Sequence, residues 1–287
     1  MTKLEGFAHP RSVEEALAAL AGAPGDARPI AGGTGLVPMA DRRARVLVDL
    51  SRAGLDGIAL DGDTVRLGAT ATLTAVVRAR AVAEAGLDAL LEAAGAAASR
   101  RLRNQITIGG NLVGLYPWSD PVPALLALGA TVRVRSAAGT RDVPIDELVA
   151  KHPSKLLQPG ELVTEIRLPR AAAHTGSAFL KFARSAVDYA LCDAAAWLRL
   201  DGKVIREARV AVGALRALPA RLVAAEKALV GQAPDPATLV AAAAAGAAEA
   251  EVTADFRASV EYRRELCGVL VRRVLETAAR RAAGRSA

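Results

Sequence analysis

The 287-residue chain has too few cysteines and histidines to build a metal centre of its own. Cys192 and Cys267 are its two cysteines, they lie far apart, and neither belongs to a CxxC pair. The three histidines, His9, His152 and His174, are scattered. Because an iron–sulfur cluster or a structural zinc ion needs about four clustered ligands, the sequence predicts neither. A redox role would therefore depend on an organic cofactor or on partner chains.

Aromatic residues are also scarce, at 3%, although the formal net charge is +7. A protein that binds single-stranded nucleic acid interleaves basic residues with stacking aromatics, and this chain has no such stripe. Its positive residues are nearly all arginines, and the densest group (Arg272, Arg273, Arg280 and Arg281) lies on an expected helix near the C-terminus. We interpret that group as a solvated helix face or a subunit interface, and we expect no nucleic-acid partner.

Long apolar runs are missing as well. The longest candidate, 239–250, is rich in alanine and carries Glu249 near its end, and a membrane-spanning helix needs about 18 apolar residues or more. Residues 1–8 lack the basic-then-apolar pattern of a secretory signal. We therefore expect a cytoplasmic protein without a membrane span. The length suits two domains.

Patterns in the first part of the chain predict mixed helices and strands. Ser12 and Glu15 have the spacing of a capping box, which predicts a helix that begins here. The turn Asp61-Gly62-Asp63 predicts a hairpin of strands 57–60 and 64–69. The other elements expected before residue 170 are strands at 28–31, 46–50, 106–108, 131–135 and 161–168 and helices at 72–79, 84–97 and 123–128.

The aperiodic stretch 170–176 marks the expected domain boundary. Beyond it, a hairpin signal at Asp201-Gly202 joins two expected strands, and three helices follow. The second domain is therefore predicted to be a three-stranded antiparallel sheet packed on helices. Its expected elements are strands at 178–183, 194–200 and 204–215 and helices at 219–230, 236–250 and 260–282.

Two glycine-rich turns are the most informative feature of the chain. They are Ala31-Gly32-Gly33-Thr34-Gly35-Leu36 and Thr107-Ile108-Gly109-Gly110-Asn111-Leu112, and each follows a short apolar run. Because glycine has no Cβ, the backbone can turn tightly there and present its N–H groups outward. Successive N–H groups form an anion-binding nest. Two such turns, far apart in sequence, predict a clamp that closes on one diphosphate, which indicates a dinucleotide cofactor.

Neither turn fits the common nucleotide-binding motifs. Pro38 stands where the GxGxxG motif needs its third glycine, and the chain has no GxxxxGK[ST] sequence. A single glycine turn of this kind could equally be a simple tight connection. Asp120 has two interpretations from residue type: it could accept hydrogen bonds from ribose hydroxyls, or it could cap the helix that follows.

Together these residues resemble the FAD-binding medium subunit of the molybdenum hydroxylases, the group of carbon monoxide dehydrogenase and xanthine dehydrogenase. The resemblance covers essentially the whole chain. It rests on the opening 7–20, AGGTGL at 31–36, TIGGNL at 107–112, PALLALGA at 123–130, EIRLP at 165–169, and the segments around Lys181, Tyr189 and Tyr262.

The resemblance implies an α+β fold of two domains. The first, residues 1–175, would be a PCMH-type FAD-binding domain, similar to vanillyl-alcohol oxidase, with subdomains of about 1–56 and 57–175. The second, residues 176–287, would be of the carbon monoxide dehydrogenase flavoprotein C-terminal type.

The resemblance also implies which residues bind the cofactor. The two glycine motifs would cradle the FAD diphosphate, with Asp120 near the ribose and diphosphate. Val163 would pack on the cofactor, Lys181 would contact it, and Tyr189 would restrict access to the isoalloxazine. The family often has Ser, Asp or Asn where this chain has Gly35, so weaker FAD binding is expected. The expected set is Ala31, Gly32, Gly33, Thr34, Gly35, Leu36, Thr107, Ile108, Gly109, Gly110, Asn111, Asp120, Val163, Lys181 and Tyr189.

The implied role is electron transfer. FAD would be bound non-covalently, because no cysteine or histidine is placed to tether it. The molybdenum cofactor would lie on a large partner subunit and the [2Fe-2S] clusters on a small one. The chain would pass electrons from these partners to an external acceptor, with no catalytic acid or base of its own.

Two alternatives remain open from the sequence. A stand-alone flavin oxidoreductase of the same fold would need a catalytic acid, for which Tyr189 and Glu161 are conceivable. A basic nucleic-acid-binding module would bind no flavin and show salt-dependent affinity. Tyr116 and Trp118 could cover the flavin, but we interpret them as core residues, because a buried tryptophan is more often a packing residue than a ligand.

Overall fold

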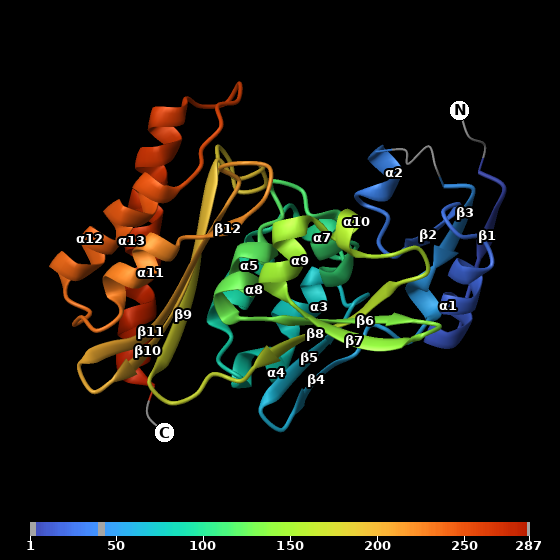
Figure 1. Cartoon of the computed structure of the whole chain (residues 1–287), viewed down its shortest axis with the longest axis horizontal. Helices are drawn as coiled ribbons and strands as arrows, with labels where there is room; N and C mark the ends of the chain where they lie inside the picture. Colours follow the sequence, from blue (N-terminus) through green and yellow to red (C-terminus); the bar gives the residue numbers. More distant parts are fainter. Residues whose placement is uncertain (1–3, 40–43, 286–287) are drawn as a thin grey trace.

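The computed structural model describes residues 4–39 and 44–285. Across these residues, three β-sheets follow one another along the long axis of the molecule (Figure 1). Their strand orders are β1-β3-β2, β4-β5-β8-β6-β7 and β12-β11-β10-β9, from the N-terminal to the C-terminal sheet. Helices pack between and around the sheets, so the predicted α+β class is confirmed.

The N-terminal sheet is small and parallel. Both outer strands pair with β3 in the parallel sense. Ser12 caps the first helix as predicted, since its hydroxyl accepts a hydrogen bond from the Glu15 N–H at 3.1 Å. The Glu15 carboxylate reaches back to the N–H of Arg11, one residue before the position that a capping box uses. The elements are β1 (Gly6–Ala8), α1 (Val13–Ala21), β2 (Ala27–Ile30), α2 (Leu36–Met39) and β3 (Val46–Asp49).

The central sheet is antiparallel, and its hairpin at Asp61-Gly62-Asp63 is confirmed, with Asp61 paired to Thr64. The expected helix 84–97 is interrupted at Gly86, whose positive φ of +67° ends one helix before the next begins. The strands are β4 (Ile58–Asp61), β5 (Thr64–Gly68), β6 (Thr131–Ser136), β7 (Gly139–Pro144) and β8 (Leu162–Pro169). The helices are η1 (Leu50–Arg52), α3 (Leu73–Arg78), α4 (Arg80–Glu84), α5 (Asp88–Ala96), α6 (Arg100–Arg103), α7 (Ile108–Gly114), α8 (Pro121–Leu128), α9 (Ile145–Lys151) and α10 (Pro153–Leu156).

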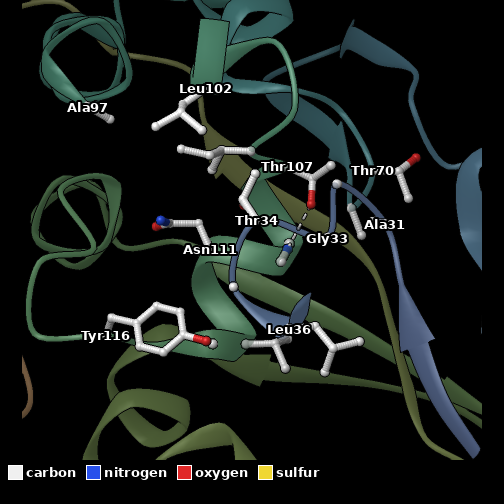
Figure 2. A pocket seen from close by; sticks show the side chains of 18 of the residues that line it. Ala31, Gly33, Thr34, Leu36, Thr70, Ala97, Leu102, Thr107, Asn111 and Tyr116 are labelled. Atoms are coloured by element: carbon white, nitrogen blue, oxygen red, sulfur yellow. Dashed lines mark hydrogen bonds between the residues drawn. The ribbon is translucent and has the colours of Figure 1, made fainter. Parts of the chain in front are cut away.

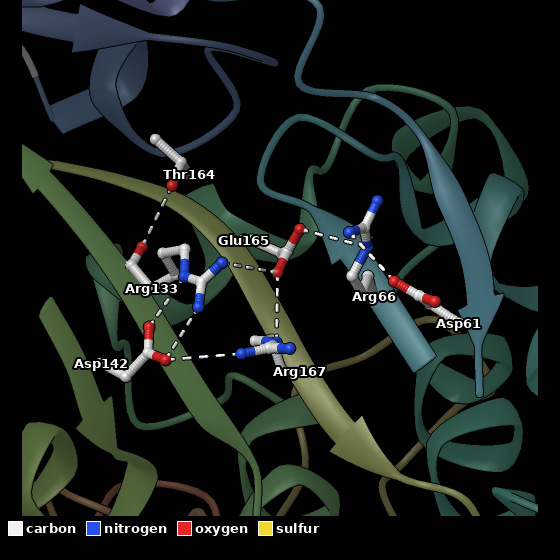
Figure 3. A network of polar contacts seen from close by, with 7 residues as sticks. All are labelled: Asp61, Arg66, Arg133, Asp142, Thr164, Glu165 and Arg167. Atoms are coloured by element: carbon white, nitrogen blue, oxygen red, sulfur yellow. Dashed lines mark hydrogen bonds and ion pairs between the residues drawn. The ribbon is translucent and has the colours of Figure 1, made fainter. Parts of the chain in front are cut away.

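The two faces of the central sheet differ in polarity. One face buries apolar side chains, including Val65 and Ile166, against the helices. The other carries a ladder of opposite charges (Figure 3), in which Arg133 binds Asp142 through two hydrogen bonds of 2.9 Å and Arg167 lies 3.4 Å from the same carboxylate. This alternation is typical of an antiparallel sheet with one face in water.

The expected strand at 106–108 is wrong. Thr107 makes an isolated bridge to Thr72, and the chain then turns directly into α7 at Ile108. The cause is local, because the Thr107 hydroxyl accepts a hydrogen bond from the Gly110 N–H at 3.1 Å and so caps the helix. The second glycine motif is therefore the first turn of a helix.

The C-terminal sheet contains the three predicted antiparallel strands and a fourth. The additional two-residue strand β12 pairs with β11, so the helix expected at 219–230 begins only at Val223. Helix α13 packs on one face of this sheet, while Phe179, Ala195 and Ala211 on the other face join the core of the central helices. The elements are β9 (Thr175–Phe182), β10 (Cys192–Asp201), β11 (Val204–Gly213), β12 (Ala220–Arg221), α11 (Val223–Leu229), α12 (Pro236–Glu249) and α13 (Val260–Gly284).

Within the part of the chain that the structure describes, no helix combines the length and apolarity needed to cross a membrane.

Candidate cofactor-binding cleft

A cleft of about 540 Å³ lies where the two glycine motifs meet. This volume falls within the roughly 300–1,000 Å³ of small-molecule sites. All of the expected cofactor-binding residues except Ile108 line this cleft. They are Ala31, Gly32, Gly33, Thr34, Gly35, Leu36, Thr107, Gly109, Gly110, Asn111, Asp120, Val163, Lys181 and Tyr189.

The first glycine motif forms an open loop between β2 and α2. A Cβ on Gly32 would lie 1.6 Å from the carbonyl oxygen of Gln105, so only glycine allows this loop to approach the segment before the second motif. Gly33 has a φ of +68°, which favours glycine. Among the described residues, no acceptor takes the N–H groups of Gly33, Thr34 or Gly35. These N–H groups therefore remain available to an anion.

The second motif does not present free N–H groups, so that part of the clamp prediction is wrong. The N–H of Gly109 donates to the carbonyl oxygen of Ala69 at 2.9 Å, and that of Asn111 donates to the Thr107 carbonyl at 2.9 Å. The glycines instead permit close packing, since a Cβ on Gly109 would lie 2.6 Å from the oxygen of Ala69. The motif brings the side chains of Thr107 and Asn111 to the cleft beside the first motif (Figure 2).

Gly35 has a partner that the sequence did not reveal. A Cβ at this position would lie 2.7 Å from the hydroxyl oxygen of Tyr116 and 2.9 Å from its Cε2 atom. The ring of Tyr116 also packs against Gly114, where a Cβ would lie 3.0 Å away. Tyr116 points across the cleft towards the first motif (Figure 2). The glycine at position 35 thus accommodates the tyrosine.

Three aromatic side chains form a stack at the cleft. The ring centroids of Tyr116 and Trp118 are 5.6 Å apart, and those of Trp118 and Tyr189 are 4.5 Å apart. Trp118 is 37% exposed and Tyr189 57% exposed. The interpretation of Tyr116 and Trp118 as core residues is therefore wrong: both line the cleft. Tyr189 comes from the loop between β9 and β10, so the stack joins two distant segments of the chain.

Asp120 and Lys181 form a buried ion pair in the cleft wall. The ammonium nitrogen of Lys181 lies 2.8 Å from Oδ2 of Asp120, and the two side chains are 8% and 3% exposed. Burial raises the pKa of Asp120 to about 6, while Lys181 opposes that rise. Asp120 stands at the start of α8 but makes no side-chain capping bond, so the helix-cap interpretation is wrong. Its Oδ1 atom and that of Asn111 have no donor among the described residues.

Of the two remaining expected residues, Val163 adds apolar surface to the cleft and Ile108 does not reach it. Val163 on β8 is almost fully buried and lines the cleft. Ile108 is fully buried in the central core, and its N–H donates to the carbonyl oxygen of Ala71 at 2.9 Å. Several lining residues carry no sequence signal, because they are apolar positions outside any motif. They include Ala97, Ala98, Leu102, Leu157, Leu162 and Val187.

The groups around the cleft fit a flavin dinucleotide. The free N–H groups at 33–35 suit a diphosphate, and the unpartnered acceptors of Asn111 and Asp120 suit hydroxyl donors of a sugar. The aromatic stack offers flat apolar surface for a ring system. Across the described ranges, no group of three or more potential metal ligands occurs.

Comparison with known families agrees with this chemistry. The model of the FAD binding domain in molybdopterin dehydrogenase matches residues 2–171, and that of the CO dehydrogenase flavoprotein C-terminal domain matches residues 177–278. The chain belongs to this family of FAD-binding oxidoreductase subunits. The family resemblance inferred from the glycine motifs is thereby confirmed, and FAD is the cofactor of the matched domain.

Relatives of this flavoprotein subunit match along nearly their whole length. The 6-hydroxypseudooxynicotine dehydrogenase complex subunit alpha of Paenarthrobacter nicotinovorans is 34% identical, covering 94% of this chain and 93% of that protein. The carbon monoxide dehydrogenase medium chain of Afipia carboxidovorans is 34% identical, covering 96% and 97%.

Solved structures agree in fold. A chain of carbon monoxide dehydrogenase from Hydrogenophaga pseudoflava superposes with a TM-score of 0.91 at 33% identity, covering 98% of this chain and 99% of that one. A chain of quinoline 2-oxidoreductase from Pseudomonas putida 86 gives 0.88 at 30% identity, with the same coverage.

Proposed function

We propose that this chain is the electron-transfer subunit of a molybdenum-containing hydroxylase complex. Its partners would be a large subunit with the molybdenum cofactor and a small subunit with [2Fe-2S] clusters, and the electrons would leave to an external acceptor. The observation that supports this best is the cleft itself, which combines free N–H groups, buried acceptors and an aromatic wall in a member of an FAD-binding family. Several relatives are named as medium chains or as subunits of dehydrogenase complexes.

Each part of the cleft has a proposed task. The N–H groups of Gly33, Thr34 and Gly35 hold the diphosphate, and the acceptors of Asn111 and Asp120 orient ribose hydroxyls. The other expected residues of the two motifs shape the cleft, and Ile108 supports it from the core. FAD, when bound, supplies exchange between two-electron and one-electron carriers.

The wall around the flavin would come from side chains of four separate segments of the chain. Val163 and Lys181 contact the cofactor, and the stacked rings of Trp118 and Tyr189 limit access to it. Binding is non-covalent, because none of the described lining residues is a cysteine or a histidine.

We also propose the division into domains at residue 175. The two family matches meet between residues 171 and 177, and β9 begins at Thr175. Within the first domain, the separate parallel sheet before residue 50 supports subdomains of about 1–56 and 57–175. Both cysteines are free and buried, which is consistent with the cytoplasm as the proposed location.

The geometry disfavours a stand-alone oxidoreductase. Glu161 reaches the cleft, but two hydrogen bonds of 2.8 Å tie its carboxylate to Arg141, which lowers its pKa. A carboxylate held in this way is a poor proton donor near neutral pH. Tyr189 is stacked on Trp118, and its hydroxyl has no acid–base partner among the described residues. Neither residue converges with another on a substrate pocket.

The test is to purify the tagged chain from its host and to measure its visible spectrum and metal content. We expect flavin, iron–sulfur absorbance, molybdenum and two further chains. A Gly32→Ala variant is the matched control, because its added methyl group strikes the Gln105 carbonyl and should abolish flavin binding. Flavin on this chain alone, with full turnover and no partners, would overturn the proposal.

A further inference from the structure

Asp193 is a fully buried carboxyl group that the proposed function does not use. It lies on β10 with 0% exposure, and neither side-chain oxygen has a hydrogen-bond donor within the described residues. In the sheet register it stands between Lys181 on β9 and Gly213 on β11. A Cβ on Gly213 would lie 2.5 Å from Oδ1 of Asp193, so the glycine leaves the room that the carboxyl group occupies.

The side chain of Asp193 faces the cleft side of the C-terminal sheet. Phe179 and Ala195 are paired in the register and both belong to the core of the central helices. Side chains two residues apart on a strand share a face, so Lys181 and Asp193 face the same way. Asp193 therefore lies directly behind the Lys181–Asp120 ion pair, which lines the cleft.

The charges packed around Asp193 decide its protonation. Asp120 at the start of α8 and Lys181 on β9 are the ionisable groups that act on it. Two other charged groups on neighbouring elements have partners of their own. Glu92 of α5 forms an ion pair with Arg281 at 2.6 Å, and the guanidinium of Arg209 on β11 lies over the ring of Trp197. Burial raises the pKa of Asp193 well above its ordinary value and the nearby Asp120 raises it further, whereas Lys181 and the backbone N–H of Gly213 oppose the rise without cancelling it.

Charge balance in this cluster requires one retained proton. Two buried carboxyl groups face a single ammonium group, and an uncompensated buried charge is strongly unfavourable. Asp120 forms the short ion pair with Lys181, whereas the carboxyl oxygens of Asp193 have no hydrogen-bond donor among the described residues. The proton therefore resides on Asp193. Loss of that proton would make the cluster negative and divide the attraction of Lys181 between two carboxylates.

We propose that Asp193 is a positioning residue that stores a proton behind the Asp120–Lys181 pair, and that release of this proton weakens dinucleotide binding. The inference rests on the proposed function of the cleft. A dinucleotide is anionic, so a negative cluster in the wall repels it, and a neutral cluster leaves Lys181 aligned with Asp120. By linkage, a bound dinucleotide in turn makes the proton harder to remove.

The test measures the affinity of the flavin-free chain for FAD from about pH 7, above the pKa of Asp120, to about pH 10, by quenching of flavin fluorescence. We expect the wild-type Kd to be constant near neutral pH and to rise in alkaline solution by about tenfold per pH unit, the slope of one proton. Asp193→Asn, which carries no proton to lose, should keep a constant Kd over that range. Asp201→Asn is the matched control: this exposed carboxyl is on the same strand and should leave the alkaline rise intact.

Melting curves without FAD separate the inference from the proposed function. The wild-type melting temperature should fall as the Asp193 proton is lost, and that fall should be absent in Asp193→Asn and in the smaller Asp193→Ala. A wild-type Kd without an alkaline rise, or a rise that persists in both variants, would overturn the inference. Absence of FAD binding at every pH would refute the proposed function, and the melting curves alone would then decide whether Asp193 stores a proton.

Discussion

For a Gly35→Ser variant, the family pattern and the local packing of this chain predict opposite changes in FAD affinity. The family pattern predicts that a serine hydroxyl would add a hydrogen bond and strengthen FAD binding. In the structure, the new Cβ would lie 2.7 Å from the hydroxyl oxygen of Tyr116 and 2.9 Å from its ring. Ordinary contact begins at about 3.5 Å, so the ring would have to move by roughly 0.8 Å.

The ring of Tyr116 has little room for that movement. Gly114 lies close on one side, and Trp118 is stacked at 5.6 Å between ring centroids. Overpacking of this kind costs about 1–3 kcal/mol. If that cost appears in cofactor binding, the Kd for FAD rises by about 5- to 150-fold.

The assay is a double-mutant cycle of Gly35→Ser and Tyr116→Ala, with the FAD Kd measured by fluorescence quenching. The serine should weaken binding in the wild-type background and have little effect beside the alanine, because the contact is then gone. Tighter FAD binding by Gly35→Ser alone, with an unchanged melting temperature, would refute the packing explanation.

Four other outcomes follow from the contacts described. Gly32→Ala should lose FAD, measured by the flavin-to-protein absorbance ratio, because the methyl group would strike the Gln105 carbonyl at 1.6 Å; retained flavin would contradict this. Lys181→Met should lower the free energy of unfolding at neutral pH by about 3–5 kcal/mol, since it leaves Asp120 buried without its partner. Burial raises the pKa of Asp120 to about 6, so the protonated form of Asp120 stabilises the fold. This contribution is present below the pKa of the unfolded chain and is lost as the pH rises through about 6. The free energies of unfolding of the wild type and of Asp120→Asn, measured by urea titration, should therefore differ in their pH dependence in this window. Ser12→Ala should reduce stability by about 0.5–2 kcal/mol in urea, and no change would mean that the cap contributes nothing.

The features that could be predicted from the sequence are those that depend on local backbone geometry. Gly32 and Gly33 stand where a side chain or a negative φ would not fit, so their residue type reports the local geometry directly. The Ser12 cap and the Asp61-Gly62-Asp63 hairpin are likewise local. Such features need no knowledge of distant segments.

Other features could not be predicted, because segments distant in the sequence determine the structure there. Trp118 belongs to the cleft because Tyr189, far along the chain, stacks on it. The strand β12 exists because β11 offers an edge to pair with. At 106–108, residue types typical of a strand were outweighed by the Thr107 cap, which starts a helix.

The C-terminal sheet and the central helices share one core, and this has a consequence for biosynthesis. Phe179 packs among the central helices, and Lys181 completes the ion pair in the cleft wall. A nascent chain that has reached only residue 171 therefore lacks both, although it contains both glycine motifs. Retained flavin would accordingly report that β9 has been made and has packed on the central helices, and a fragment that ends at residue 171 would be a poor substitute for the subunit in reconstitution.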